Sequence, residues 1–160
     1  MIDGTRKTYF SPQDDTVAAF LAFIKMAKKK IRIADYSFNL EALVELLIEL
    51  HKKDLDIQLI LDKSQSSGES EKPAIARLTR AKVPFVIGTS DMHKIMHNKF
   101  TVVDDVWVQS GSWNYTAAAA DEDNFFDIEH SEERAQIFTA DWQRRFDWIT
   151  TNEPQKQRNS

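Results

Sequence analysis

The segment MHNKFTVVDDVWVQSGSWN, residues 96–114, decides how the fold is interpreted. It contains two stretches in which apolar residues recur at every second position, HNKFTVVD and VWVQS, joined by two aspartates. This period predicts two β-strands, and so short a connection predicts a hairpin. Residues two apart in a strand share a face, so His97 and Lys99 are expected to point one way and Phe100 the other.

Strand-like and helical patterns alternate before this segment. Short apolar runs of strand length are each followed by a stretch with apolar residues at helical spacing. Strands are expected near residues 7–10, 31–38, 56–62 and 83–87, and helices within 11–30, 40–53 and 73–81. Such β-α-β alternation predicts an α/β fold with a mostly parallel or mixed sheet flanked by helices.

The pattern changes again after the hairpin. A further strand is expected at 124–129, followed by an amphipathic helix from Ser131 to about Trp148 that begins with acidic residues. We expect residues 1–150 to form one domain and the polar residues 151–160 to form a flexible tail.

Composition limits the functions to consider. The 160 residues include 21 basic and 25 acidic side chains, so no global positive field marks a polyanionic partner and any phosphate binding must be local. The chain has no cysteine, which excludes disulfides and thiolate metal sites. No apolar run approaches the roughly 20 residues of a membrane span, and the first residues lack a signal-peptide core. A cytoplasmic location is therefore the default expectation, without a membrane partner.

The polar residues of the opening segment suit phosphodiester chemistry. A cation beside a histidine favours the neutral imidazole, which then keeps a lone pair for attack, and Lys99 can also hold an anionic substrate against His97. The hairpin returns Gly111, Ser112 and Asn114 to the same end of the sheet. Glycine allows a close backbone approach, and the hydroxyl and amide can donate to phosphate oxygens as their charge builds up.

The spacing His97-x-Lys99-x4-Asp104-x6-Gly111-Ser112-x-Asn114 resembles the HxKxxxxD and GSxN signature of the phospholipase D superfamily. The resemblance extends over most of the chain and is closest to the small bacterial endonucleases that carry one motif per chain. It implies a phospholipase D-like half and a symmetric homodimer with a composite active site. It also implies that no metal and no cofactor take part.

The resemblance assigns roles to individual residues. His97 would be the nucleophile that forms a phosphohistidine, with His97 of a second subunit protonating the leaving oxygen, while Lys99, Ser112 and Asn114 would hold the phosphate. Among the other catalytic candidates, the motif residue Asp104 more often fixes the hairpin than touches substrate.

One acidic role stays open between two residues. The related endonucleases have a glutamate immediately before an asparagine, and this carboxylate orients the histidine. Here Asp123 occupies that position before Asn124, with Glu122 as the second candidate. Lys63 is a further substrate-binding candidate, because ligands of open α/β sheets gather at the carboxyl ends of strands.

Three functions follow from this interpretation. The first is a metal-independent, non-specific endonuclease that cleaves nucleic acid, with DNA favoured and RNA possible. The second is a phospholipase D-type lipid phosphodiesterase, and the third is a catalytically inactive nucleic-acid-binding or dimerisation module. A zinc site at His93 and His97 is disfavoured, because HKIMH lacks the glutamate of HExxH.

Overall fold

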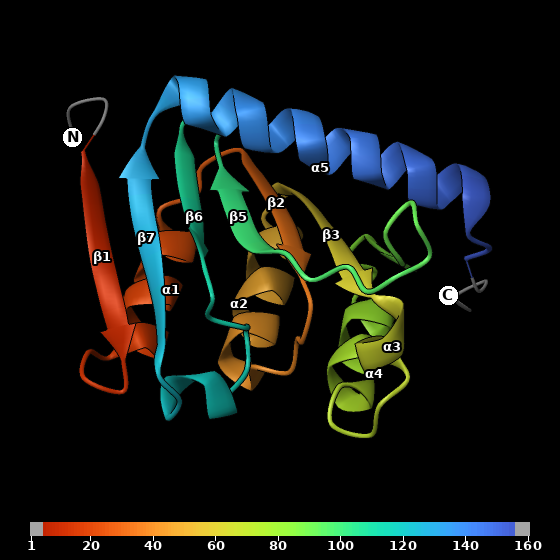
Figure 1. Cartoon of the computed structure of the whole chain (residues 1–160), viewed down its shortest axis with the longest axis horizontal. Helices are drawn as coiled ribbons and strands as arrows, with labels where there is room; N and C mark the ends of the chain where they lie inside the picture. The colour runs from red at the N-terminus through yellow and green to blue at the C-terminus, as the bar shows by residue number, and fades with distance from the viewer. Residues whose placement is uncertain (1–4, 156–160) are drawn as a thin grey trace.

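The computed structural model describes residues 5–155 and has a seven-stranded sheet at its centre (Figure 1). The strands are β1 Arg6–Ser11, β2 Lys30–Asp35, β3 Asp56–Asp62, β4 Phe85–Gly88, β5 Lys99–Val103, β6 Trp107–Gly111 and β7 Asn124–His130. The helices are α1 Thr16–Lys25, α2 Glu41–Lys52, α3 Lys63–Ser66, α4 Lys72–Arg80, α5 Glu132–Asn152 and the short 3-10 helix η1 Ala118–Ala120. The expected strands and long helices are all present, whereas α3 lies in a stretch that was expected to be a loop.

The sheet is mixed, with the order β1-β7-β6-β5-β2-β3-β4. Only the pairs β2·β3 and β3·β4 are parallel, and the other four pairs are antiparallel. The expectation of a mostly parallel sheet is therefore wrong, and that of a mixed sheet is confirmed. The sheet is mixed because β5 pairs with β2 in the antiparallel direction. This direction is possible because residues 89–98 connect β4 to β5 without a crossover helix.

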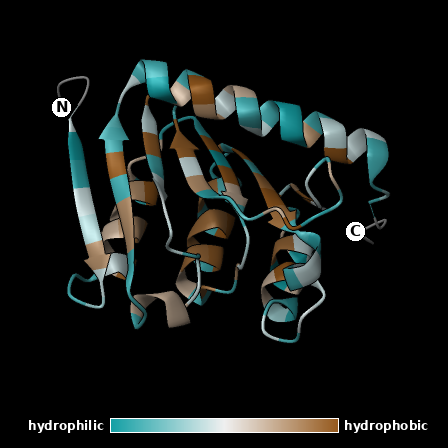
Figure 2. Cartoon of the chain, in the orientation of Figure 1, coloured by the Kyte–Doolittle hydropathy of each residue, from teal (hydrophilic) through white to brown (hydrophobic). Residues whose placement is uncertain are grey.

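Helices cover both faces of the sheet. One core cluster joins α1, α2 and α4 to one face, and a second cluster joins α5 to the other. Helix α5 is anchored by its buried residues Ala135, Trp142 and Ile149, and the Trp142 indole donates to the carbonyl of Ile33 over 2.8 Å. Figure 2 shows the hydrophobic residues concentrated in α2 and the central strands. None of the helices within residues 5–155 is long and apolar enough to span a membrane.

The chain beyond α5 is held in place as far as Gln155. Helix α5 ends at Asn152, a few residues later than expected. The Gln155 side chain bonds both backbone groups of Ile87, accepting from its N–H and donating to its carbonyl over 2.9 Å each. Of the expected tail, residues 151 and 152 thus belong to α5 and Gln155 is bonded to β4, whereas residues 156–160 lie outside the described part of the chain.

The β5–β6 hairpin is tied to the start of β2 through Asp104. Residues 104–106 connect the two strands, and Asp104 and Asp105 have left-handed φ angles of 53° and 57° in a turn that is closed by a 3.2 Å hydrogen bond from the Val106 N–H to the Val103 carbonyl. The Asp104 carboxylate accepts hydrogen bonds of 2.8–2.9 Å from three consecutive backbone N–H groups, those of residues 28–30. Asp104 therefore satisfies donors that the sheet leaves unpaired, and it fixes β5 beside β2.

Removing the Asp104 carboxylate should destabilise the fold. We expect Asp104→Ala to lower the free energy of unfolding by about 2–4 kcal/mol, because it removes charge-assisted hydrogen bonds and strains a left-handed residue. Asp104→Asn, which tolerates that conformation, should cost about half as much. Urea unfolding measures both. Asp105→Asn is the matched control, since its ion pair with Lys30 is at the surface, and an equal loss there would contradict the assignment.

Candidate active site

The predicted nucleophile lies at the edge of the sheet where β2 and β3 end and β5 begins (Figure 1). Lys99 is the first residue of β5 and pairs in register with Asp35, the last residue of β2. His97, two residues before Lys99, is exposed, whereas Lys99 is only 8% exposed. The antiparallel entry of β5 thus places an accessible imidazole beside a nearly buried ammonium.

Tyr36 organises this pair, and it was not anticipated from the sequence. The Lys99 ammonium lies 5.2 Å from the centre of the Tyr36 ring and donates to the His97 carbonyl over 2.6 Å. The His97 ring meets the same tyrosine edge to face, with 4.7 Å between ring centroids. Gln65 donates to the Tyr36 hydroxyl over 3.0 Å. The position of Tyr36 directly after a buried strand was the signal that could have identified it.

The surroundings of His97 favour its neutral form. Partial burial lowers the pKa of the imidazole, the nearby Lys99 ammonium lowers it further, and the Asp62 carboxylate opposes both. Burial also lowers the pKa of Lys99, which Asp35 opposes. A neutral imidazole keeps the lone pair that nucleophilic attack requires.

Asp62 fixes the segment that carries His97. One carboxylate oxygen accepts from the backbone N–H groups of Ser64 and Gln65 and so caps α3, over 2.9 and 3.1 Å. The other oxygen accepts from the backbone N–H of Met96 over 2.8 Å. The carboxylate therefore connects the end of β3 to Met96, the residue immediately before His97.

Two further buried acids lie behind the site, and neither was identified from the sequence. Asp35 is fully buried, and burial raises the pKa of its carboxyl well above the usual value although the Tyr115 backbone N–H donates to it over 3.3 Å. Burial likewise raises the pKa of Glu71 to about 7. The Glu71 carboxyl accepts from the backbone N–H of Phe38 over 2.9 Å. Both carboxyl groups therefore stay protonated up to a higher pH than an exposed carboxyl does.

Ser112 and Asn114 reach the same edge from β6. The Ser112 hydroxyl donates to the Asn124 side chain over 3.0 Å and accepts from the Phe125 backbone N–H over 3.2 Å. The Asn114 side-chain oxygen accepts from the backbone N–H of Ser37 over 3.3 Å, which orients its amide nitrogen as a donor.

Gly111 allows this close approach. A Cβ atom at Gly111 would lie 2.3 Å from the Phe125 carbonyl oxygen, so the residue before Ser112 has to be glycine for β6 and β7 to pair here.

The remaining predicted residues occupy other environments. Asp123 and Glu122 are both exposed, and within residues 5–155 neither carboxylate is hydrogen-bonded to His97, so their orienting role stays a prediction. Lys63 is paired with Glu153, with 3.2 Å between nitrogen and oxygen. Asp104 lies at the opposite end of β5 from Lys99, so its place among the catalytic candidates is corrected to a structural role.

His93 does not join His97 in a shared site. Its backbone has a φ of 58°, and its ring packs on Trp148 with 5.6 Å between centroids, whereas His97 packs on Tyr36. Residues 5–155 contain no group of three or more His, Asp or Glu side chains placed to hold a metal ion.

The mixed sheet and the histidine and lysine at the start of β5 are the features expected of a phospholipase D-like domain. The family model described as the cardiolipin synthase, PLD-like domain matches residues 20–149, and the chain therefore belongs to the phospholipase D superfamily. Members of this superfamily hydrolyse phosphodiester bonds, and the chain is a phosphodiester hydrolase of this type.

Known proteins give the same assignment. The chain is 27% identical over 140 residues to a protein named phospholipase D from Rickettsia bellii, covering 86% of this chain and 67% of that protein. It is 23% identical over 115 residues to the mitochondrial cardiolipin hydrolase of Chlamydomonas reinhardtii, covering 72% of this chain and 50% of that protein.

Two solved structures share the fold over nearly their whole length. Nuc, a phospholipase D family member from Salmonella typhimurium, superposes with a TM-score of 0.84 at 25% identity, covering 91% of this chain and 95% of that chain. NucT from Helicobacter pylori is similar in fold, with a TM-score of 0.80 at 18% identity and coverages of 91% and 97%.

The buried acid Glu71 makes stability depend on pH. Its pKa of about 7 in the folded state exceeds that of an unfolded glutamate, roughly 4.3, so its contribution to stability is lost as the pH rises between these values. We expect Glu71→Gln to match the parent near pH 4 and to be more stable at pH 8, by on the order of 3 kcal/mol. Urea unfolding at both pH values tests this.

The exposed Glu69 provides the control for that comparison, because its ion pair with Lys72 lies in solvent. Glu69→Gln should leave the difference between the two pH values unchanged. A Glu71→Gln effect of the same size at both pH values would contradict the assignment.

Proposed function

We propose that the protein is a metal-independent endonuclease that cleaves nucleic acid through a phosphohistidine at His97. The observation that carries the proposal is the exposed His97 imidazole, with a lowered pKa, beside the nearly buried ammonium of Lys99. Nucleic acid rather than lipid is favoured by the overlap with Nuc, of which this chain covers 95%, and by the resemblance of the motif to the small single-motif endonucleases. DNA is the favoured substrate, with RNA as the second.

The chemistry divides into two displacements. In the first, a ring nitrogen of His97 attacks phosphorus, the P–N bond forms as the P–O bond breaks, and the partner subunit's His97 protonates the leaving oxygen. In the second, the partner subunit's imidazole takes a proton from water, the water oxygen attacks phosphorus and the P–N bond breaks. Two identical histidines in opposite protonation states titrate as a coupled pair.

Donors at the same edge support the phosphate during both steps. Lys99 supplies positive charge, and the amide nitrogen of Asn114 supplies a neutral donor. Ser112 donates to Asn124 in this structure, so its hydroxyl proton must turn from Asn124 to the phosphate when substrate binds. Asp123, or Glu122 in its place, is the candidate to orient the imidazole.

A lipid phosphodiesterase is the second candidate function. It is favoured by the exposure of Met92 (76%) and Ile95 (47%) on the segment that leads to His97, since exposed apolar side chains beside a site suit a membrane surface. The relative names phospholipase D and mitochondrial cardiolipin hydrolase agree with this alternative. A binding-only module is the third.

Cleavage of nucleic acid in excess EDTA tests the proposal. We expect purified protein to cut labelled single-stranded DNA and plasmid under these conditions, and His97→Ala to lose about 1,000-fold or more in rate, because the nucleophile is removed. RNA is assayed in parallel. The matched control is His93→Ala, a second exposed histidine, which should stay within about two-fold of the parent.

Three results would reverse this assignment. Loss of cleavage in EDTA would contradict the metal-independent route, and a His97→Ala variant that still cuts would exclude the histidine as nucleophile. Headgroup release from phospholipid vesicles without cleavage of nucleic acid would favour the lipid enzyme.

A homodimer with one composite site makes a second, quantitative prediction. Copies of the parent chain and of His97→Ala, carrying different affinity tags, can be co-expressed and the mixed dimer isolated through both tags. Because both histidines are needed in turn, the mixed dimer should have under about 1% of the parental activity. A parental dimer with both tags is the control. Half of its activity in the mixed dimer would show that each subunit works alone.

A further inference from the structure

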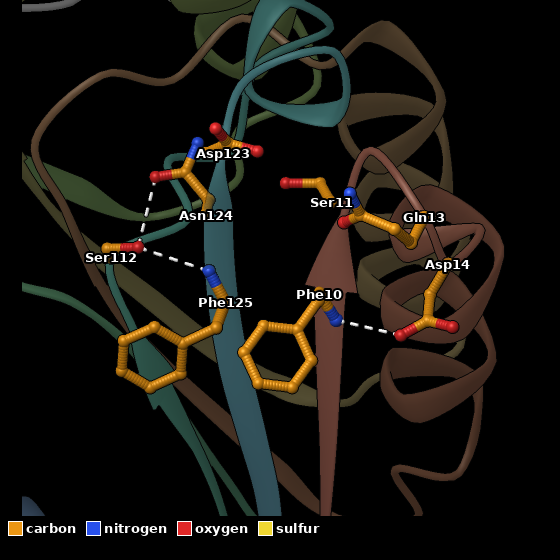
Figure 3. Close-up of a pocket in the computed structure, with 8 residues that line it drawn as sticks. All are labelled: Phe10, Ser11, Gln13, Asp14, Ser112, Asp123, Asn124 and Phe125. Carbon is orange, nitrogen blue, oxygen red and sulfur yellow. Dashed lines mark hydrogen bonds between the residues drawn. The ribbon is translucent and has the colours of Figure 1, made fainter.

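A hollow of about 570 Å³ lies beside Ser112, where β1 ends and β7 begins (Figure 3). Ser112, a predicted phosphate ligand, forms part of the wall, so the hollow borders the candidate active site at this residue.

Two aromatic rings form the apolar part of this hollow. Phe10 on β1 and Phe125 on β7 are paired in register, and their ring centroids lie 6.3 Å apart at an interplanar angle of 40°. They remain 54% and 41% exposed. The next residue, Phe126, is fully buried on the face covered by α1, so Phe125 points to the opposite face. Helix α5 leaves β7 at its far end and leaves this part of the sheet open (Figure 1).

Hydrogen-bonding groups form the rest of the lining. The Asp14 carboxylate accepts from the Phe10 backbone N–H over 2.8 Å, and Asp123 and Gln13 lie across the opening (Figure 3). The hollow thus has two carboxylates and, among its described lining residues, no lysine or arginine. Such a lining disfavours a phosphate group and favours a flat, apolar ligand with N–H groups on its edge.

We propose that this hollow binds a nucleobase that flanks the scissile phosphate, with the base stacked on Phe10 and Phe125 and its edge facing Asp14 and Gln13. The inference rests on the proposed nuclease function and specifies its substrate. Every base has an aromatic face, so stacking tolerates any sequence, whereas a base held in this way has to be unpaired. The expected substrate is therefore a single-stranded or locally opened strand.

The distance to the phosphate favours a base over a lipid headgroup. A phosphate held between Lys99 and Ser112 would lie between β5 and β6, and the centre of the aromatic pair lies two strands further along the sheet, about 10 Å away. In a choline headgroup only one oxygen and two methylenes separate the ammonium from phosphorus, which is too short a link. A sugar and a neighbouring nucleotide can cover that distance.

Oligonucleotides that lack one base test the proposal. A labelled single-stranded DNA is cut in EDTA alongside a series in which one abasic residue occupies each position near the cleaved bond. For the parent protein, one flanking position should lower kcat/KM by about ten-fold, the effect of one lost stacking interaction. The double variant Phe10→Ala, Phe125→Ala should cleave the complete strand with a kcat/KM about ten-fold below that of the parent. On the strand that is abasic at this position its kcat/KM should equal that of the parent, because the stacking interaction is already absent.

The control variant is Ile137→Ala, which removes an exposed apolar side chain from α5 and should cut all strands like the parent. Circular dichroism and sedimentation establish that the double variant keeps its fold and its oligomeric state. The base subsite would be overturned if the parent protein cleaved all abasic strands equally well. It would also be overturned if the double variant lost the same factor in kcat/KM on the complete and the abasic strands. The nuclease function would stand in both cases.

Other outcomes identify other occupants. Dissociation of a dimer in the double variant would assign the aromatic pair to the interface between subunits and overturn the proposal. Loss of headgroup release from phosphatidylcholine vesicles, with unchanged cleavage of oligonucleotides, would assign it to a lipid. If the parent protein cuts no nucleic acid at all, the proposed function fails, and this inference fails with it.

Discussion

The antiparallel pairing of β5 with β2 is the constraint on which the active site depends. At one end of this pairing Asp104 bonds three backbone N–H groups at the start of β2, and at the other Lys99 lies opposite Asp35. Asp62 holds the backbone just before His97 from the neighbouring strand. Two carboxylates thus fix β5 in direction and position, and the position of His97 follows from where the strand begins.

The electrostatics of the site follow from burial next to that strand. Partial burial of His97 itself lowers the pKa of its imidazole, and the neighbouring ammonium of the nearly buried Lys99 lowers it further, so the neutral form is favoured. This arrangement lowers the stability of the fold, because Asp35 is fully buried and one of its carboxylate oxygens has no hydrogen-bond partner among the described residues. An unpaired buried oxygen costs stability, and such costs are common where a site has to be held in one geometry.

Local patterns predicted what local forces determine. The hairpin at Asp104, the strand ranges and the helices followed from periodicity, turn chemistry and caps, and the motif placed His97, Lys99, Ser112 and Asn114 at one edge of the sheet.

What the sequence could not predict depends on contacts between distant segments. The pairing of β1 with β7 joins residues more than 100 positions apart, for example Ser11 with Asn124. The burial of Glu71 and the contact of Tyr36 with His97 likewise exist only in the folded chain.

The central claim is that His97 attacks phosphorus directly. Its most direct test is to mix the protein with a labelled oligonucleotide, quench in alkali during turnover and map the peptides by mass spectrometry. We predict the phosphate-bearing fragment attached to His97 and absent from His93; product that accumulates without such an adduct, or an adduct on another residue, would contradict the account.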